Sequence, residues 1–306
     1  MNAVGIDVSK GKSNVAVIQP FGVVIAEPFD VFHTDQDLKE LVAFLKTLSG
    51  ETKVVMEYTG TYYEPIANAL HNAGIFVSVV NPLLIDDYDT NRVRKVKTDK
   101  IDALKIASFA LDKWLKLREY TPASTIRKTL KVLNRQYIKL NKMLVMQKNS
   151  LIALLDCCFP NANTLFTSSR RTSDGHEKWV DFVLKFPHVD LVAKLSLSAF
   201  QSKYQSWCKK EHYNFNASKA AEIHAFSRTL VSTLPMTESA KKIVYESAKA
   251  LNSTLKALEK FHSEMEVLAS QLPEYETVSG SYLFACQLVK CIISVLYCAV
   301  KLLDCC

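Results

Sequence analysis

Two long stretches of heptad-like spacing constrain the fold of this chain more than any other feature of its sequence. The first places apolar residues at alternating intervals of four and three, with Gln147 at its one polar core position: Ile126, Leu130, Leu133, Tyr137, Leu140, Leu144, Leu151 and Leu154. The second has the same spacing: Val244, Ala248, Leu251, Leu255, Leu258, His262 and Met265. A period of about 3.5 residues predicts coiled-coil helices. The two helices can pair within one chain as an antiparallel hairpin or between chains, and long bundle helices would show the same period.

The first part of the chain has a different pattern, one of strands followed by alternating helices and strands. Three β-rich runs, AVGIDVS, SNVAVIQ and GVVIAEPFDV, occupy residues 3–31. Helices are predicted at 34–48, with Thr34 as N-cap, at 61–74 and at 99–118. Strands are predicted at 52–58 and 75–81, the second ended by Pro82. This order predicts a mixed sheet with helices on its faces.

These patterns predict a division of the chain into five segments. An α/β domain over 1–118 is followed by a first coiled-coil helix. A helical insertion then separates that helix from its partner, and an apolar, cysteine-rich tail closes the chain. The predicted ranges after the first domain are 119–156, 157–236, 237–272 and 273–306.

Positive charge is concentrated in one part of the chain. Residues 92–148 contain 16 Lys and Arg against four acidic residues, a charge of +12, so the rest of the chain carries −5 of the total +7. A basic segment on a slightly acidic body is typical of proteins that bind polyanions such as nucleic acids. A solvated helical face explains the charge equally well.

The cysteines and the apolar tail exclude several classes of protein. The eight cysteines have neither CxxC spacing nor histidine partners, which argues against a zinc site. No signal peptide precedes the first strand, so we expect a reduced, cytoplasmic location. The run 282–303 has the length of a membrane span, but Lys290 lies inside it and a central lysine costs about 3 kcal/mol on insertion scales. We therefore expect no membrane anchor.

Four acidic residues form the candidate site. Asp7 ends the first predicted strand and Glu57 ends the fourth, whereas Asp99 and Asp102 are three residues apart on a predicted helix and so share one face. A carboxylate in an apolar sheet must be paired or bound to a metal. Four carboxylates at one sheet edge can hold two divalent ions about 4 Å apart, which suits phosphodiester chemistry. Oxygen ligands of this kind fit Mg²⁺.

Other roles for these residues stay open at this stage. The motif NRVRKVKTDKIDALKIA, residues 91–107, is also consistent with a solvated charged face, and Asp99 or Thr98 can cap the helix. The basic residues nearby would hold a nucleic-acid backbone by charge. They are Lys10, Arg92, Arg94, Lys95, Lys97 and Lys100. Gly60 lets the backbone approach a metal or phosphate, or it simply forms a turn with Thr61 as the next N-cap.

The four motifs together resemble a known family. GIDVSK (5–10), VMEYTGTYY (55–63), Asn81-Pro82 and KTDKIDALKIA (97–107) are similar to the DEDD transposases of the insertion-sequence family one-ten, which also includes Piv-type DNA invertases. The resemblance covers about the first 115 residues strongly and extends to the coiled-coil arrangement. It implies a ribonuclease H-like, Holliday-resolvase-like fold for 1–118.

The resemblance also implies a function and its partners. Asp7, Glu57, Asp99 and Asp102 would be a Mg²⁺-binding catalytic tetrad for two ions. The substrate would be DNA, recombined under the guidance of a bridge RNA from the same element. Coiled coils would assemble dimers into tetramers.

The end of the chain departs from the family pattern. The family has a glycine-rich second catalytic domain with a nucleophilic serine after the coiled coil. Here LPEYETV is followed by SGSYLFACQLVKCIISVLYCAVKLLDCC, with one glycine and no motif around Ser279 or Ser281. We therefore expect a truncated copy that fails in full strand exchange. The alternatives are a nucleic-acid-binding protein without catalysis and a metal-dependent junction nuclease.

Overall fold

The first 57 residues build most of one sheet. The computed structural model describes residues 1–88 and 99–275, with the side chains of 87, 88, 99 and 100 left out of the description. The strands are β1 (Asn2–Ser9), β2 (Lys12–Gln19), β3 (Val23–Phe32), β4 (Thr52–Glu57) and β5 (Phe76–Val80). All five predicted strands are therefore confirmed, because short β-branched runs between turn residues are a strong local signal.

The strand order in the sheet is β3-β2-β1-β4-β5. β1, β2 and β3 are antiparallel neighbours, whereas β1, β4 and β5 are parallel. Three antiparallel strands followed by two parallel strands in this order form the ribonuclease H-like α/β fold. The predicted fold class is confirmed for this part of the chain.

Helices cover both faces of the sheet. They are α1 (Asp35–Thr47), α2 (Glu64–Asn72), α3 (Pro82–Tyr88) and α4 (Asp99–Asp112). Thr34 caps α1 as predicted, accepting a hydrogen bond from the backbone N–H of Asp37. Two predicted helix boundaries were wrong. Residues 61–63 form a turn before α2, whose N-cap is Tyr63 and not Thr61, and α4 ends at Asp112 because residues 113–116 form a turn.

Each face of the sheet has its own hydrophobic cluster. On one face Val4, Ile6 and Val8 of β1 pack with Leu41 of α1 and Ile66 of α2. On the other face Ala3, Val55 and Ile18 pack with apolar residues of α4, such as Ile106 and Ala107. Side chains of a strand alternate between the two faces. Every β1 position can therefore be assigned to the α1–α2 face or to the α4 face.

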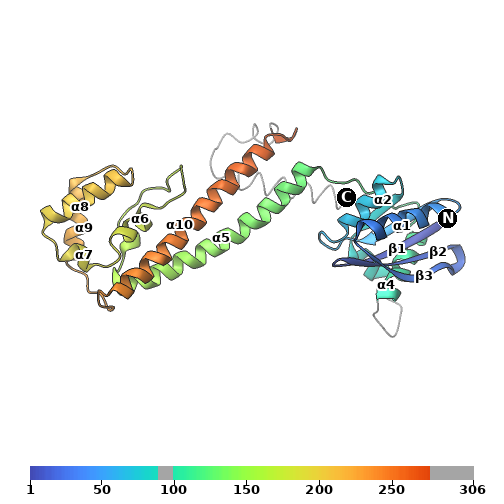
Figure 1. Ribbon diagram of the computed structural model, residues 1–306, viewed down its shortest axis with the longest axis horizontal. Coiled ribbons are helices and arrows are strands. Elements are labelled where there is room, and N and C mark those ends of the chain that lie inside the picture. Colours follow the sequence, from blue (N-terminus) through green and yellow to red (C-terminus); the bar gives the residue numbers. More distant parts are fainter. Residues whose placement is uncertain (89–98, 276–306) are drawn as a thin grey trace. The chain divides into compact units, whose positions relative to one another are not determined.

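A second structural unit begins at Ser124, and the first ends at Ala123. Two long helices dominate the second unit, α5 (Thr125–Cys158) and α10 (Glu238–Ala269) (Figure 1). They pack along each other in opposite directions. The Tyr137 and His262 rings lie 6.5 Å apart, and Arg127 Nη2 lies 2.6 Å from Glu274 Oε1. In this chain the two long helices pair with one another.

The apolar residues at the heptad-like positions of both helices are largely the ones that are buried. In α10, Val244, Ala248, Leu251 and Leu255 are almost completely buried. In α5 the buried row shifts near the C-terminal end, where Leu155 is buried and Leu154 is only partly so. An α-helix has about 3.6 residues per turn, so an apolar row with a 3.5-residue period drifts around the helix.

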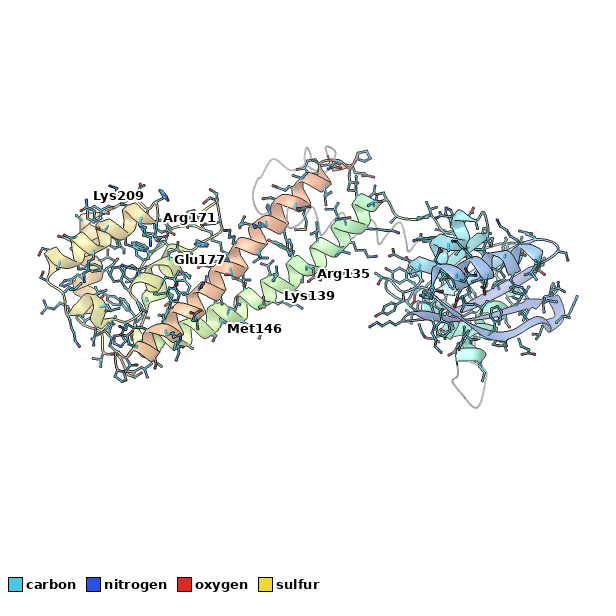
Figure 2. The ribbon with its side chains drawn as sticks, viewed as in Figure 1. Arg135, Lys139, Met146, Arg171, Glu177 and Lys209 are labelled. Carbon is cyan, nitrogen blue, oxygen red and sulfur yellow. The ribbon has the colours of Figure 1, made fainter. Side chains whose placement is uncertain are left out.

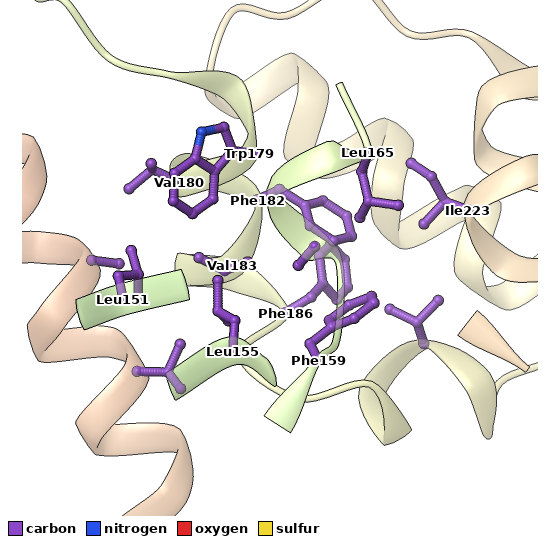
Figure 3. Close-up of a cluster of buried hydrophobic side chains, with 14 of the residues drawn as sticks. Leu151, Leu155, Phe159, Leu165, Trp179, Val180, Phe182, Val183, Phe186 and Ile223 are labelled. Atoms are coloured by element: carbon purple, nitrogen blue, oxygen red, sulfur yellow. The ribbon is translucent and has the colours of Figure 1, made fainter. Parts of the chain in front are cut away.

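The segment between the long helices forms a small helical body. Its helices are α6 (Lys178–Lys185), α7 (Asp190–Ala193), α8 (Leu197–Lys210) and α9 (Ala217–Ser227). Figure 3 shows Leu151 and Leu155 of α5 meeting Phe159, Phe182 and Phe186 in its core. Aromatic side chains bury large areas, which explains how such short helices form a stable cluster.

A carboxylate fixes this helical body to α10. Asp181 of α6 is 4% exposed and accepts hydrogen bonds from Tyr213 Oη at 2.6 Å and from Asn252 Nδ2 at 2.7 Å. His176 Nδ1 lies 3.0 Å from the same carboxyl. These contacts satisfy a buried charge by hydrogen bonding, as burial requires.

Within residues 1–88 and 99–275, no helix is long and apolar enough to cross a membrane.

Candidate carboxylate site

The face of the sheet covered by α4 carries both predicted strand carboxylates. In β1, residues 4, 6 and 8 point to the α1–α2 face, so Ala3, Gly5 and Asp7 belong to the α4 face. In β4, Val54 and Met56 belong to the α1–α2 face and Val55 to the α4 face. Glu57 follows the same alternation as Val55. Asp7 and Glu57 therefore share the face on which α4 packs.

The register of β1 and β4 brings these two residues to the same row. The parallel pairing joins Gly5 to Val55 and Ile6 to Met56. Asp7 and Glu57 come next on their respective strands. Both lie where parallel strands end, the edge at which open α/β sheets place their ligand sites. β4 ends at Glu57, but β1 continues to Ser9, so the prediction that Asp7 ends the first strand was wrong by two residues.

Gly5 allows α4 to approach the sheet more closely than any other residue would. A Cβ added at Gly5 would lie 2.1 Å from the carbonyl oxygen of Ala103 and 2.3 Å from the backbone nitrogen of Ala107. The helix backbone thus rests directly on β1. Asp102 comes directly before Ala103 on α4. Asp7 comes two residues after Gly5 on β1. The close approach places the start of α4 over the carboxyl ends of β1 and β4.

The electrostatics of Glu57 show that the carboxylates lie near each other. Burial raises the pKa of the Glu57 carboxyl above its ordinary value, and the negative charge of Asp7 raises it further. Asp86 and Asp102 act on this pKa in the same direction. A half-buried acid whose neighbours are also acids is a good binding group for a cation.

Two residues that the sequence did not predict belong to this cluster. Asp86 of α3 adds to the negative charge around Glu57, and Lys105 of α4 reduces it. Lys105 Nζ lies 3.4 Å from Asp86 Oδ1, and its side chain is only 16% exposed. Lys105 follows Asp102 by three residues, so the two share a helix face. That spacing was a usable signal for Lys105, but no local pattern marks Asp86.

The remaining predicted residues are only partly covered by the structure. Asp99 is the first residue of α4, and its side chain is outside the description, as is that of Lys100. Lys10 is exposed in the turn between β1 and β2. Arg92, Arg94, Lys95 and Lys97 lie outside the described residues, as do Ser279, Ser281 and the predicted tail 276–306.

Gly60, in the loop between Glu57 and α2, has φ 66°, a left-handed conformation that favours glycine. Open space surrounds the position of a Cβ there. The backbone conformation, and not crowding, therefore explains this glycine.

The donor set fits a hard divalent cation. Carboxylate oxygens are the ligands that Mg²⁺ prefers. Within the described residues, no three acidic, histidine or cysteine side chains are arranged as a ready ligand shell.

The strand order defines a ribonuclease H-like α/β fold with two carboxylates in one row of its sheet. A family profile described as a transposase, of the DEDD type IS110, matches residues 4–160, just over half of the chain. The chain belongs to this family of DEDD transposases. Their activity is enzymatic, the cutting and joining of DNA.

Solved structures similar to this chain include two of RuvC from Thermus thermophilus. One, in complex with a Holliday junction substrate, has 14% identity and a TM-score of 0.30, covering 38% of this chain and 96% of RuvC. The other has 15% identity and a TM-score of 0.29, covering 39% and 100%. The search of curated proteins gave no match.

Proposed function

We propose that this transposase cleaves DNA at a divalent-cation site formed by Asp7, Glu57, Asp99 and Asp102. The observation that carries the proposal is the register of β1 and β4, which puts Asp7 and Glu57 in one row on the face covered by α4. Burial and the negative charges of Asp7, Asp86 and Asp102 raise the pKa of the Glu57 carboxyl, which supports the same grouping. Those carboxylates come from different elements that meet at the carboxyl ends of β1 and β4. Family membership supports DNA as the substrate.

Each residue of the site has a role that follows from its position. Asp7 and Glu57 supply oxygens from the rigid sheet, and Asp102, with Asp99 one turn earlier, supplies them from α4. Two Mg²⁺ ions held there would activate the attacking oxygen and stabilise the leaving oxygen of the phosphodiester. Because the sheet and α4 are in backbone contact at Gly5, these side chains start from a fixed framework.

Basic residues around the site would hold the nucleic acid. Lys10 is exposed beside β1. The basic residues that precede α4 in the sequence are Arg92, Arg94, Lys95 and Lys97, and Lys100 is the second residue of that helix. Phosphate contacts of this kind orient a strand without reading its sequence. On the second unit, Arg135 and Lys139 project from the exposed side of α5 (Figure 2). We propose that DNA and the bridge RNA of the element are bound by these charges.

Self-assembly is part of the proposal. Family resemblance supports dimers or tetramers formed through the long helices. The outward side of α5 carries exposed apolar residues that α10 does not cover, among them Val132, Val145 and Met146. Exposed apolar groups on a helix favour contact with a further protein surface.

Cleavage of a branched DNA junction by the full 306-residue chain, with Mg²⁺ and the element's RNA, tests the proposed function. We expect Asp102→Asn to abolish cleavage but to leave nucleic-acid binding unchanged. Asp112→Asn is the matched control, since Asp112 is exposed at the other end of the same helix. Cleavage by Asp102→Asn at the wild-type rate would contradict the proposal.

The same assay distinguishes the alternatives. RNA and DNA binding without cleavage in the wild-type protein would identify a non-catalytic nucleic-acid-binding protein. Cleavage without strand exchange or a covalent protein–DNA product would identify a junction nuclease. The expected failure of strand exchange stays a prediction, and this product analysis tests it.

A further inference from the structure

A row of polar side chains crosses the sheet beside Asp7. The register joins Asp7 of β1 to Asn14 of β2, and Asn14 to Asp30 of β3. Directly paired residues of antiparallel strands point to the same face. Asn14 therefore lies on the α4 face, next to Asp7. It stands on the opposite side of Asp7 from Glu57, because β1 lies between β2 and β4.

Asn14 is buried, and its two amide atoms have different surroundings. The side chain is 4% exposed. Its Nδ2 donates a hydrogen bond to Asp30 Oδ1 at 3.0 Å. Its Oδ1 is buried and has no hydrogen-bond partner among the described residues. A buried carbonyl oxygen without a donor is rare in native proteins and calls for an explanation.

The orientation of the amide follows from its neighbour. The nitrogen of Asn14 faces Asp30, because a carboxylate oxygen accepts the hydrogen bond that the amide N–H donates. Lys12 Nζ lies 3.6 Å from the other carboxyl oxygen, Asp30 Oδ2. The amide oxygen is then left on the branch that does not face β3. An oxygen lone pair is thus available beside Asp7.

We propose that Asn14 Oδ1 is a further oxygen donor of the divalent-cation site, next to Asp7, and that Asp30 holds its amide in this orientation. The inference rests on the proposed function, because it needs a cation at the carboxylates. Neutral amide oxygens and carboxylates are both suitable for a hard, hydrated cation. The partner that Asn14 Oδ1 lacks would then be the cation or a water molecule bound to it.

The alternative is that Asn14 is only structural, and the two roles predict different responses to Mg²⁺. Under both roles Asn14→Leu loses the hydrogen bond from Nδ2 to Asp30, and this loss is small because about half of the Asp30 side chain is exposed to water. Only the loss of a cation ligand also lowers cation affinity and the rise in Tm that Mg²⁺ causes. Asn14→Leu therefore separates the two roles.

Asn2 provides a matched control. It is 1% exposed at the start of β1, and its Nδ2 donates to Ser49 O and Thr52 Oγ1, both at 3.0 Å. Its Oδ1 accepts from Gln19 Nε2 at 2.9 Å. All of its polar atoms are therefore partnered, and it lies at the other end of the strand. Asn2→Leu should lower Tm without changing cation affinity.

The experiment is calorimetric titration of the full chain with Mg²⁺ and with Mn²⁺, together with thermal unfolding in EDTA and in Mg²⁺. For Asn14→Leu we expect a smaller rise in Tm between EDTA and Mg²⁺ than in wild type. We expect cation affinity to fall by roughly 10–100-fold, the usual effect of losing a residue that supports a metal site. A loss of less than about threefold, well below that range, would overturn the inference.

Two further variants keep the test decisive. If Asn14→Leu does not fold, Asn14→Asp replaces it. This variant retains an oxygen and adds a buried charge beside Asp7 and Asp30, so Mg²⁺ should raise its Tm more than it raises that of wild type. An equal or smaller rise would overturn the inference.

Asp7→Asn separates the inference from the proposed function. If wild type itself binds neither cation, the proposed function and the inference both fail. If Asp7→Asn loses cation binding and Asn14→Leu keeps it, only the inference fails.

Discussion

Gly5 of β1 and Ala103 of α4 are in backbone contact, and a Cβ on Gly5 would lie 2.1 Å from the Ala103 carbonyl oxygen. Such a separation is far inside van der Waals contact, and the atom opposite is backbone that no side-chain rotation can move. The placement of α4, and with it that of Asp102, therefore depends on the absence of one methyl group.

Gly5→Ala should destabilise the first unit and separate α4 from β1. Overpacking of a tight interface costs about 1–3 kcal/mol. We also expect the Mg²⁺-dependent rise in Tm to disappear, because Asp102 moves with the helix. Thermal unfolding with and without Mg²⁺ measures both effects. Gly22→Ala is the control, since open space surrounds its Cβ and only its φ of 78° is strained. It should keep the Mg²⁺ response.

The raised pKa of Glu57 predicts how the stability of the metal-free protein depends on pH. The folded state holds the Glu57 proton to higher pH than the unfolded state, in which the carboxyl has its ordinary pKa of 4.5. The unfolded state thus binds fewer protons, and stability falls as pH rises from 4.5 through the raised pKa. Glu57→Gln should remove this part of the decline and be more stable than wild type at neutral pH in EDTA. Unfolding curves from pH 4 to 8 test it, and a decline of equal size in the variant would contradict the assignment.

Lys105 offers a prediction about charge balance. Lys105→Met removes the cation that faces Glu57 and pairs with Asp86. We expect a loss of up to about 1 kcal/mol at neutral pH, because the Asp86 side chain is largely exposed. Added Mg²⁺ should reduce that loss, and Lys105→Arg should restore stability. Lys39→Met, which breaks an exposed pair with Asp35, is the control and should be nearly neutral. If Mg²⁺ affects both methionine variants equally, Lys105 does not face the site.

The hydrogen bonds of the buried Asp181 carboxylate are expected to stabilise the helical body between the two long helices. Asp181→Ala leaves the donors of Tyr213 and Asn252 unpaired in the interior. Removing one partner from a buried charged network costs about 3–5 kcal/mol. Hydrogen exchange should show lost protection in α6 and in the middle of α10. Glu222→Ala, which removes an exposed ion pair with Lys219, should cost about 0–1 kcal/mol and leave exchange unchanged.

Local sequence patterns were sufficient for the five strands and the two long helices, but no predicted element covered α3. The β-branched runs gave five strands, and the heptad spacing gave two long helices with their buried faces. Ends of elements were less predictable. The predicted helix over 99–118 ends at Asp112, because the backbone turns before Trp114, which packs against Lys53 of β4. Lys53 and Trp114 are far apart in the sequence, so no local pattern predicted their contact.

Local patterns also predicted part of the candidate site. Strand patterns placed Asp7 and Glu57 on two predicted strands, and helical spacing determined that Asp99 and Asp102 share a face. These rules are local, since they follow from the repeat of a strand or a helix. The charge excess between residues 92 and 148 was likewise readable directly from the sequence.

Only the tertiary structure decided which other groups join these carboxylates. Asp86 and Lys105 reach Glu57 because α3 and α4 pack on one face of the sheet, and Asn14 lies beside Asp7 because the β1–β2 register pairs them. Register and close backbone approach depend on contacts between distant residues. A one-residue slip would move Asn14 to the other face. The sequence therefore determined which residues are able to form a site, and packing determined which of them meet.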